Sequence, residues 1–222
     1  MMFTIHRTGG KLMRTIFKPE QTVLFQGDSI TDCGRNFADQ NSLGDGYANI
    51  VVNMFQIMFP EHKVKFINKG ISGNRAIDLL ERYDEDIKKI NPDFISILIG
   101  INDTWRRYDS NEATSAEEYE KNYRTILEKI KMDLPHCKIM IMEPFLLNSL
   151  PDRNEWREDL DPKIQVVRKL AKKYADYYLP LDGIFAKAEV EEYCCAEMAE
   201  DGVHPSSVGH SIIARGYLEI IV

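Results

Sequence analysis

The chain has 222 residues, a length that fits one domain with a full hydrophobic core. Its 28 Lys and Arg against 35 Asp and Glu give a net charge of −7, and no basic stripe is interleaved with aromatic residues. This charge balance argues against nucleic acid or an anionic membrane surface as a partner.

Cysteine usage and the amino-terminal segment indicate where the protein works. The cysteines at positions 33, 137, 194 and 195 form no Cys-x-x-Cys pair, as is typical of a reducing compartment. The first twenty residues lack the apolar core of a signal peptide, and no apolar run is long enough to span a bilayer. We therefore expect a cytoplasmic protein with no membrane partner, with residues 1–20 as an N-terminal extension and residues 21–222 as a single domain.

Apolar runs rich in Val, Ile and Phe alternate along the chain with longer segments of helical periodicity. In chain order the runs are TVLFQ, KVKFIN, DFISILIG, CKIMIME and the weaker YYLPLD. Near-continuous apolar runs are typical of parallel strands covered on both faces. Their alternation with helices predicts an α/β fold, with a five-stranded parallel sheet between helical layers.

The helical segments predicted between and after these runs are 46–59, 75–90, 115–133 and 154–177, with shorter ones near 184–199 and 206–221. The segment 115–133 has the clearest pattern. Ser115 and Glu118 form a capping box at its start, and its apolar residues recur on one face.

In a parallel sheet the functional site lies outside the carboxyl ends of the strands. This rule directs attention to the loops 27–34, 69–74, 100–108 and 144–150 and to the last loop of the chain. Four of these regions contain small or polar residues, in GDSITDCG, NKGISGNR, GINDTWRRYD and EDGVHPSSVGH.

Together these loops hold the residue types that acyl transfer requires. A nucleophile, a base and a group that orients the base are available in Ser29, His204 and Asp201. The negative oxygen of the reaction intermediate needs hydrogen-bond donors, and these are available in the backbone N–H groups of Ser29 and Gly73 and in the Asn102 side chain. Taken singly, each of these residues also has a structural interpretation, as a turn residue, an exposed histidine or a helix cap.

A metal site is an alternative use of the same residues. Asp28, Asp201 and His204 are of the types that bind metals, but the sequence has no H-E-x-x-H motif and no Cys/His cluster. We therefore expect no metal and no cofactor.

The four blocks together resemble those of the SGNH hydrolases, also called GDSL-type esterases or lipases. The markers of that family match Ser29 in Gly27-Asp28-Ser29, Gly73, Asn102 in the block 100–103 and His204 in the block 201–205. The resemblance extends over residues 22–210 and implies a three-layer α/β/α, flavodoxin-like fold. One departure is Ile30, where the family name has Leu. The serine does not lie in a G-x-S-x-G elbow, which disfavours an α/β-hydrolase.

A narrower resemblance links these blocks to the intracellular acetyl xylan esterases of that family, which remove acetyl groups from xylo-oligosaccharides. It implies a small ester or acetylated oligosaccharide as substrate, and it favours a homo-oligomer. Trp105, equally compatible with a core position, would then form a wall for a sugar ring. Asp28 is expected to support the nucleophile turn and is counted with Trp105 as a substrate-binding residue.

Two other functions stay open at this point. One is a lysophospholipase or thioesterase that acts on longer acyl chains. The other is a carbohydrate-binding protein that keeps the fold without catalysis.

Overall fold

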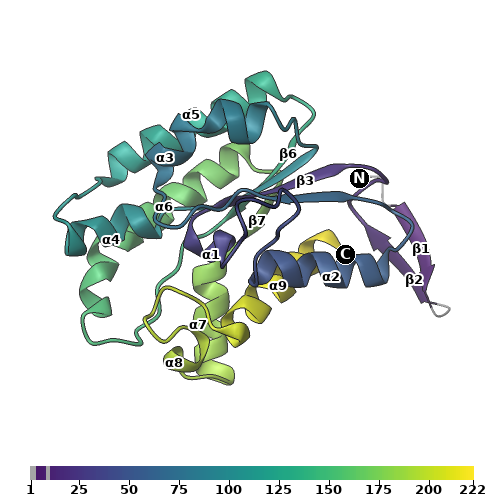
Figure 1. Ribbon diagram of the computed structural model, residues 1–222. Helices are drawn as coiled ribbons and strands as arrows, with labels where there is room; N and C mark the ends of the chain where they lie inside the picture. The colour runs from purple at the N-terminus through teal and green to yellow at the C-terminus, as the bar shows by residue number, and fades with distance from the viewer. Residues whose placement is uncertain (1–3, 9–10) are drawn as a thin grey trace.

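The computed structural model describes residues 4–8 and 11–222, and a five-stranded sheet forms the centre of the fold (Figure 1). The strands of this sheet are β3 (Thr22–Gly27), β4 (Lys65–Asn68), β5 (Phe94–Leu98), β6 (Lys138–Met142) and β7 (Tyr177–Leu179). They lie in the order β4-β3-β5-β6-β7, and every neighbouring pair is parallel. This is the flavodoxin-like order, so the predicted fold class is confirmed.

Helices cover both faces of the sheet, because successive strand side chains point to opposite faces. On one face Leu24, Ile95 and Ile97 pack in a common cluster with side chains of α3 (Ala76–Glu81), α5 (Ala116–Asp133) and α6 (Arg153–Tyr174). On the other face Val23 and Phe25 pack with α2 (Tyr47–Met58), α7 (Leu181–Glu191) and α9 (Ser207–Ile221). Figure 1 shows the resulting three layers.

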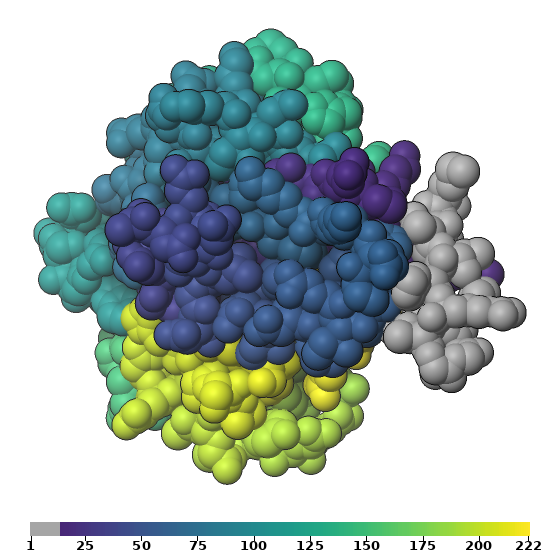
Figure 2. All heavy atoms as spheres, turned by 45° about the vertical axis from the view of Figure 1, so that its right-hand side comes forward, coloured from purple at the N-terminus to yellow at the C-terminus, as the bar shows by residue number. Residues whose placement is uncertain are grey.

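The helices α2 and α9 lie side by side under β3, the strand that leads to Ser29. In Figure 2 the yellow C-terminal part of the chain lies directly against the blue part that contains α2. The ring of Tyr217 on α9 lies 5.5 Å from that of Phe25 and 6.5 Å from that of Tyr47 on α2. Burial of side chains of this kind contributes about 1.5–3 kcal/mol each, and it anchors the strand below the nucleophile turn.

The N-terminal residues include two strands that the sequence did not predict. The strands β1 (Thr4–Thr8) and β2 (Lys11–Thr15) form an antiparallel pair outside the main sheet. After them the chain is tied to the domain, because the Thr15 hydroxyl donates to the carbonyl of Ile221 at 2.8 Å and Phe17 is buried. Part of the expected extension therefore packs against the domain. The division at residue 20 stays a prediction.

Two predicted segments have a different structure from the one expected. The single helix over 75–90 is divided into α3 and a short π-helix, η1 (Asp84–Lys88). The loop expected at 100–108 is instead a helix, α4 (Ile101–Asp109). Gly100 permits the abrupt turn from β5 into α4: its φ is +134°, and a Cβ atom there would lie 2.6 Å from the Tyr119 hydroxyl.

The remaining helices are short and lie beside the loops of interest. They are α1 (Ser29–Asp32), directly after β3, and α8 (Cys195–Met198), shortly before the last loop.

Candidate active site

Ser29 lies on a tight turn between β3 and the short helix α1. The Asp28 side chain caps this helix, because its Oδ1 accepts a hydrogen bond from the N–H of Ile30 at 3.0 Å. The Asp28 carbonyl accepts from the N–H groups of Thr31 and Asp32. These bonds hold Ser29, which is half-buried, at the carboxyl edge of the sheet.

The structure brings Ser29, His204 and Asp201 into one hydrogen-bonded line, although His204 lies 175 positions after Ser29 in the sequence. Ser29 Oγ lies 2.9 Å from His204 Nε2, and His204 Nδ1 lies 2.7 Å from Asp201 Oδ2. The other Asp201 oxygen accepts from the N–H groups of Val203 and His204 at 2.9 and 2.7 Å. One carboxylate therefore fixes both the last loop and the imidazole.

The pKa values of this pair are shifted by their mutual contact. The hydrogen bond to Asp201 raises the pKa of His204 above its usual 6.5. Burial acts to raise the pKa of Asp201, but the hydrogen bonds from His204 and Val203 outweigh it and lower that pKa to about 2. The aspartate is thus ionised at neutral pH, and it stabilises the imidazolium that forms when His204 takes a proton.

Arg153, at the start of α6, holds the last loop in place by a hydrogen bond to its backbone. Its Nε donates to the Asp201 carbonyl at 2.7 Å, and its guanidinium carbon lies 4.0 Å from the ring centre of Trp156. The sequence did not single out either residue, because both lie inside a helical segment beyond the strand-end motifs. An arginine close after the loop 144–150 was the only available signal.

The expected donors to a negative oxygen follow three neighbouring strands, because Gly73, Ser29 and Asn102 come after β4, β3 and β5. Gly73 has a φ of +83°, a conformation that glycine adopts without strain. Asn102 Nδ2 donates one hydrogen to the Asn74 carbonyl at 3.0 Å, and its amide nitrogen carries a second hydrogen. Within the described part of the chain, the N–H groups of Ser29 and Gly73 donate no hydrogen bond. The N–H groups of Ser29 and Gly73 and one N–H of the Asn102 amide are therefore available as donors.

Asp28 lies beneath the nucleophile turn and not at a surface that a substrate could reach. Its side chain is fully buried and bonds to the N–H of Ile30, so it does not reach a substrate. Burial raises its pKa to about 7. The substrate-binding role expected for Asp28 is corrected accordingly, whereas its expected support of the nucleophile turn agrees with this geometry.

Trp105 lies on α4 beside the imidazole. Its ring centre is 5.5 Å from that of His204 and 5.2 Å from that of Trp156. Tyr108 stacks on Trp156 at 5.1 Å. Trp105 is half-buried, so part of this aromatic group is accessible.

Across residues 4–8 and 11–222 there is no group of three or more His, Cys, Asp or Glu side chains that could hold a metal ion. Among the helices that the structure describes, none is long and apolar enough to cross a membrane.

The chain belongs to the GDSL-like Lipase/Acylhydrolase family, whose model matches residues 25–212. This match includes all four sequence blocks, and it confirms the resemblance proposed from them. The protein is therefore a carboxylic ester hydrolase of the SGNH type.

Relatives within the family make the likeness more specific. The chain is 37% identical over 210 residues to an acetylxylan esterase of Geobacillus stearothermophilus, an alignment that covers 90% of this chain and 94% of the relative. The crystal structure of that species' acetylxylan esterase Axe2 superposes with a TM-score of 0.83 at 35% identity, covering 91% and 94% of the two chains. A structure from Parabacteroides merdae, described provisionally as a GDSL-like lipase, has a TM-score of 0.85 at 32% identity and covers 91% and 96%.

Proposed function

We propose that this protein removes acetyl groups from xylo-oligosaccharides or related carbohydrates by a Ser-His-Asp double displacement. The hydrogen-bonded line from Ser29 Oγ through His204 to Asp201 is the observation that carries the proposal. Structures of the Geobacillus enzyme are also known for variants described as catalytic mutants, in which a serine, an aspartate or a histidine is replaced by alanine. The same three residue types form the line in this chain.

In the first displacement, His204 Nε2 accepts the Ser29 proton while Oγ attacks the ester carbonyl. The carbonyl oxygen becomes negative and receives hydrogen bonds from the Ser29 and Gly73 N–H groups and the Asn102 side chain. Asp201 keeps Nδ1 protonated and stabilises the imidazolium. The imidazolium then gives its proton to the leaving alcohol, and an acetyl-serine remains.

In the second displacement, water opens this acetyl-serine. His204 accepts a proton from the water as it attacks the acetyl carbonyl, and the same donors hold the negative oxygen. The proton returns to Ser29 Oγ when acetate leaves. The residues of the chain account for every proton transfer, so we propose no metal and no cofactor.

Acyl-chain length separates this proposal from the lysophospholipase or thioesterase alternative. Esters of acetate and octanoate with the same alcohol would be compared by kcat/KM. We expect the acetyl ester to be hydrolysed faster, because the aromatic wall of Trp105 beside His204 favours a carbohydrate rather than an alkyl chain. A higher kcat/KM for octanoate would favour the alternative.

A serine-directed organophosphonate separates the proposal from a carbohydrate-binding protein without catalysis. We expect one adduct, located at Ser29 by peptide mass analysis, because only a serine beside a base is activated in this way. A protein that stays unlabelled would support the binding function. The cytoplasmic location and the homo-oligomer remain predictions.

A further inference from the structure

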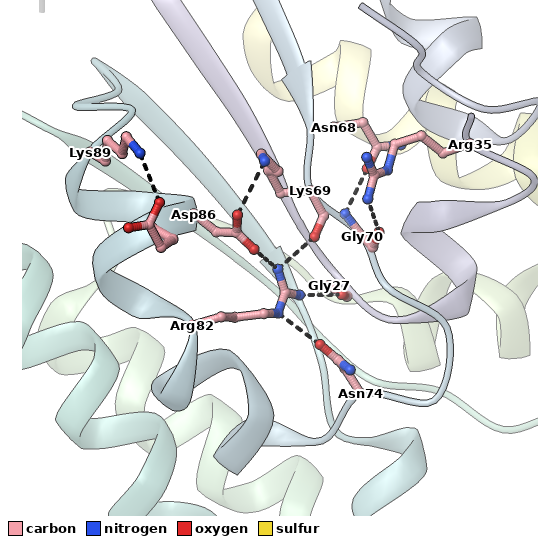
Figure 3. Close-up of polar contacts among 10 residues, drawn as sticks. Gly27, Arg35, Asn68, Lys69, Gly70, Asn74, Arg82, Asp86 and Lys89 are labelled. Atoms are coloured by element: carbon pink, nitrogen blue, oxygen red, sulfur yellow. Dashed lines mark hydrogen bonds and ion pairs between the residues drawn. The ribbon is translucent and has the colours of Figure 1, made fainter. Parts of the chain in front are cut away.

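Arg82 lies at the end of α3, between the end of β3 and the loop after β4 (Figure 3). Its Nε donates to Asn74 Oδ1 at 2.8 Å. Its Nη1 donates to the Lys69 carbonyl at 2.9 Å and to Asp86 Oδ2 at 2.6 Å. Its Nη2 donates to the Gly27 carbonyl at 3.2 Å. Through two backbone carbonyls and two side chains, one guanidinium therefore contacts three separate segments of the chain: the end of β3, the loop after β4, and η1.

Two of these segments carry the groups that must meet at the ester carbonyl. Gly27 is the last residue of β3, two residues before Ser29. Asn74 follows Gly73, and its own carbonyl accepts the hydrogen bond from Asn102 Nδ2. Arg82 thus connects the nucleophile turn directly to the loop of one expected oxyanion donor, and through Asn74 to the other.

The surroundings of Arg82 suit a fixed positive charge. Its side chain is only 15% exposed, and Asp86 on η1 forms an ion pair with it. Asp86 also pairs with Lys69 at 3.1 Å, so the carboxylate lies between two cations. A π-helix is rare and often occurs at functional sites, and η1 is the element that contains Asp86.

Among the cationic side chains, only arginine can donate to all four acceptors at this position. Its planar group has five N–H donors that point in fixed directions, whereas the ammonium of lysine is a single point with three. The four acceptors lie around three nitrogen atoms of the guanidinium. A lysine ammonium could serve Asp86 and one carbonyl, but not both loops at once.

We propose that Arg82 is a positioning residue for ester hydrolysis, which sets the spacing between Ser29 and the oxyanion donors Gly73 and Asn102. The inference rests on the proposed roles of these three residues. Arg82 itself does not touch the substrate. A shift of about 1 Å between reacting groups can lower the rate about 100-fold, so loss of the spacing should weaken transition-state binding much more than substrate binding.

The test compares the wild-type protein with R82Q and R82K. For each protein, kcat and KM are measured on a small acetyl ester, together with the inhibition constant of an alkyl boronic acid that forms a tetrahedral adduct with an active serine. For R82Q we expect kcat to fall about 10- to 100-fold with KM changed less than about threefold, and the boronic acid to bind more weakly by a similar factor. R82K should lie between R82Q and the wild type.

R157Q is the matched control, because it removes another arginine whose ion-pair partners, Asp182 and Asp161, are not proposed site residues. Arg157 binds both oxygens of Asp182 at 2.7 and 3.0 Å, and its side chain is 29% exposed. We expect R157Q to lower the melting temperature and to leave the boronic acid affinity unchanged. The inference is overturned if R82Q binds the boronic acid as the wild type does, or if R157Q loses as much affinity as R82Q.

A second variant keeps the test decisive if R82Q does not fold. N74A removes one acceptor of Arg82 and leaves the guanidinium in place. We expect N74A to lower kcat several-fold in the wild-type background and to have a smaller effect in R82K. Equal effects in both backgrounds would overturn the inference. If the wild type neither hydrolyses the acetyl ester nor binds the boronic acid, the proposed function fails; if it does both, only Arg82 is being tested.

Discussion

The ring of Trp105 lies 5.5 Å from the ring of His204, with the two planes inclined by 54°. Trp105 belongs to α4, after the third strand of the predicted order, and His204 belongs to the last loop. The side chain expected to face a sugar is therefore a direct neighbour of the proposed base. In the proposed function, this contact places the wall for the sugar directly beside the base.

Replacing Trp105 should affect a carbohydrate substrate more than a small one. W105A is expected to raise KM for an acetylated xylo-oligosaccharide by up to about tenfold, because stacking of an aromatic ring contributes about 0.5–1.5 kcal/mol. For p-nitrophenyl acetate the change should be less than about threefold. W105F, the control, should retain most of the affinity. Equal effects of W105A on both esters would argue against a sugar wall.

The pH dependence of hydrolysis should report the state of His204. The base must be neutral to accept a proton from Ser29, so kcat/KM should fall as the pH is lowered through the His204 pKa. Because Asp201 raises that pKa, the midpoint should lie above 6.5. D201N removes the main cause, so its midpoint should move to lower pH, together with a loss of rate. A midpoint that is the same in D201N and the wild type would contradict this assignment.

Asn102 should contribute mainly to the transition state. N102A removes a proposed oxyanion donor, and loss of one such donor typically lowers kcat about 10²–10³-fold. KM should change much less, because the oxygen becomes negative only after attack. The melting temperature of N102A controls for the lost bond to the Asn74 carbonyl. A variant with normal kcat would remove Asn102 from the site.

Asp28 should affect folding stability in two ways, through its capping hydrogen bond at the start of α1 and through its raised pKa. D28A loses the bond to the Ile30 N–H, which costs about 0.5–2 kcal/mol of folding stability, whereas the amide oxygen of D28N can still accept this bond.

Burial raises the pKa of Asp28 to about 7, so the folded state holds a proton that the unfolded state releases from about pH 4 upward. The wild type should therefore lose stability relative to D28N as the pH rises from about 4 to 7. Unfolding by urea at several pH values measures this difference, and a constant difference would contradict it.

The sheet could be predicted from the sequence because its strands are short, continuous and apolar. The helix α4 could not, since INDTWRRYD is mostly polar and its buried first turn includes Asn102, Asp103 and Thr104. Asp103 is held there by accepting from the Ala76 N–H at 3.1 Å, a contact between segments that no local pattern indicates. The π-helix after α3 also has no periodic signal in the sequence.

The candidate site could be predicted where its residues end a strand. Ser29, Gly73 and Asn102 follow three neighbouring strands, and the order β4-β3-β5 brings their loops together. Arg82 and Arg153 could not be identified in this way, because each lies on a helix and acts on backbone carbonyls. A carbonyl group is present at every residue, so the sequence does not mark which one an arginine will bind.

Acetate release from acetylated xylo-oligosaccharides by the wild type and S29A tests the central claim most directly. The wild type should release acetate, and S29A, with an unchanged far-ultraviolet circular dichroism spectrum, should lose at least about 10³-fold in kcat, because no other group can form the acetyl intermediate. Acetate release by S29A at a rate near that of the wild type would contradict the claim that Ser29 is the nucleophile.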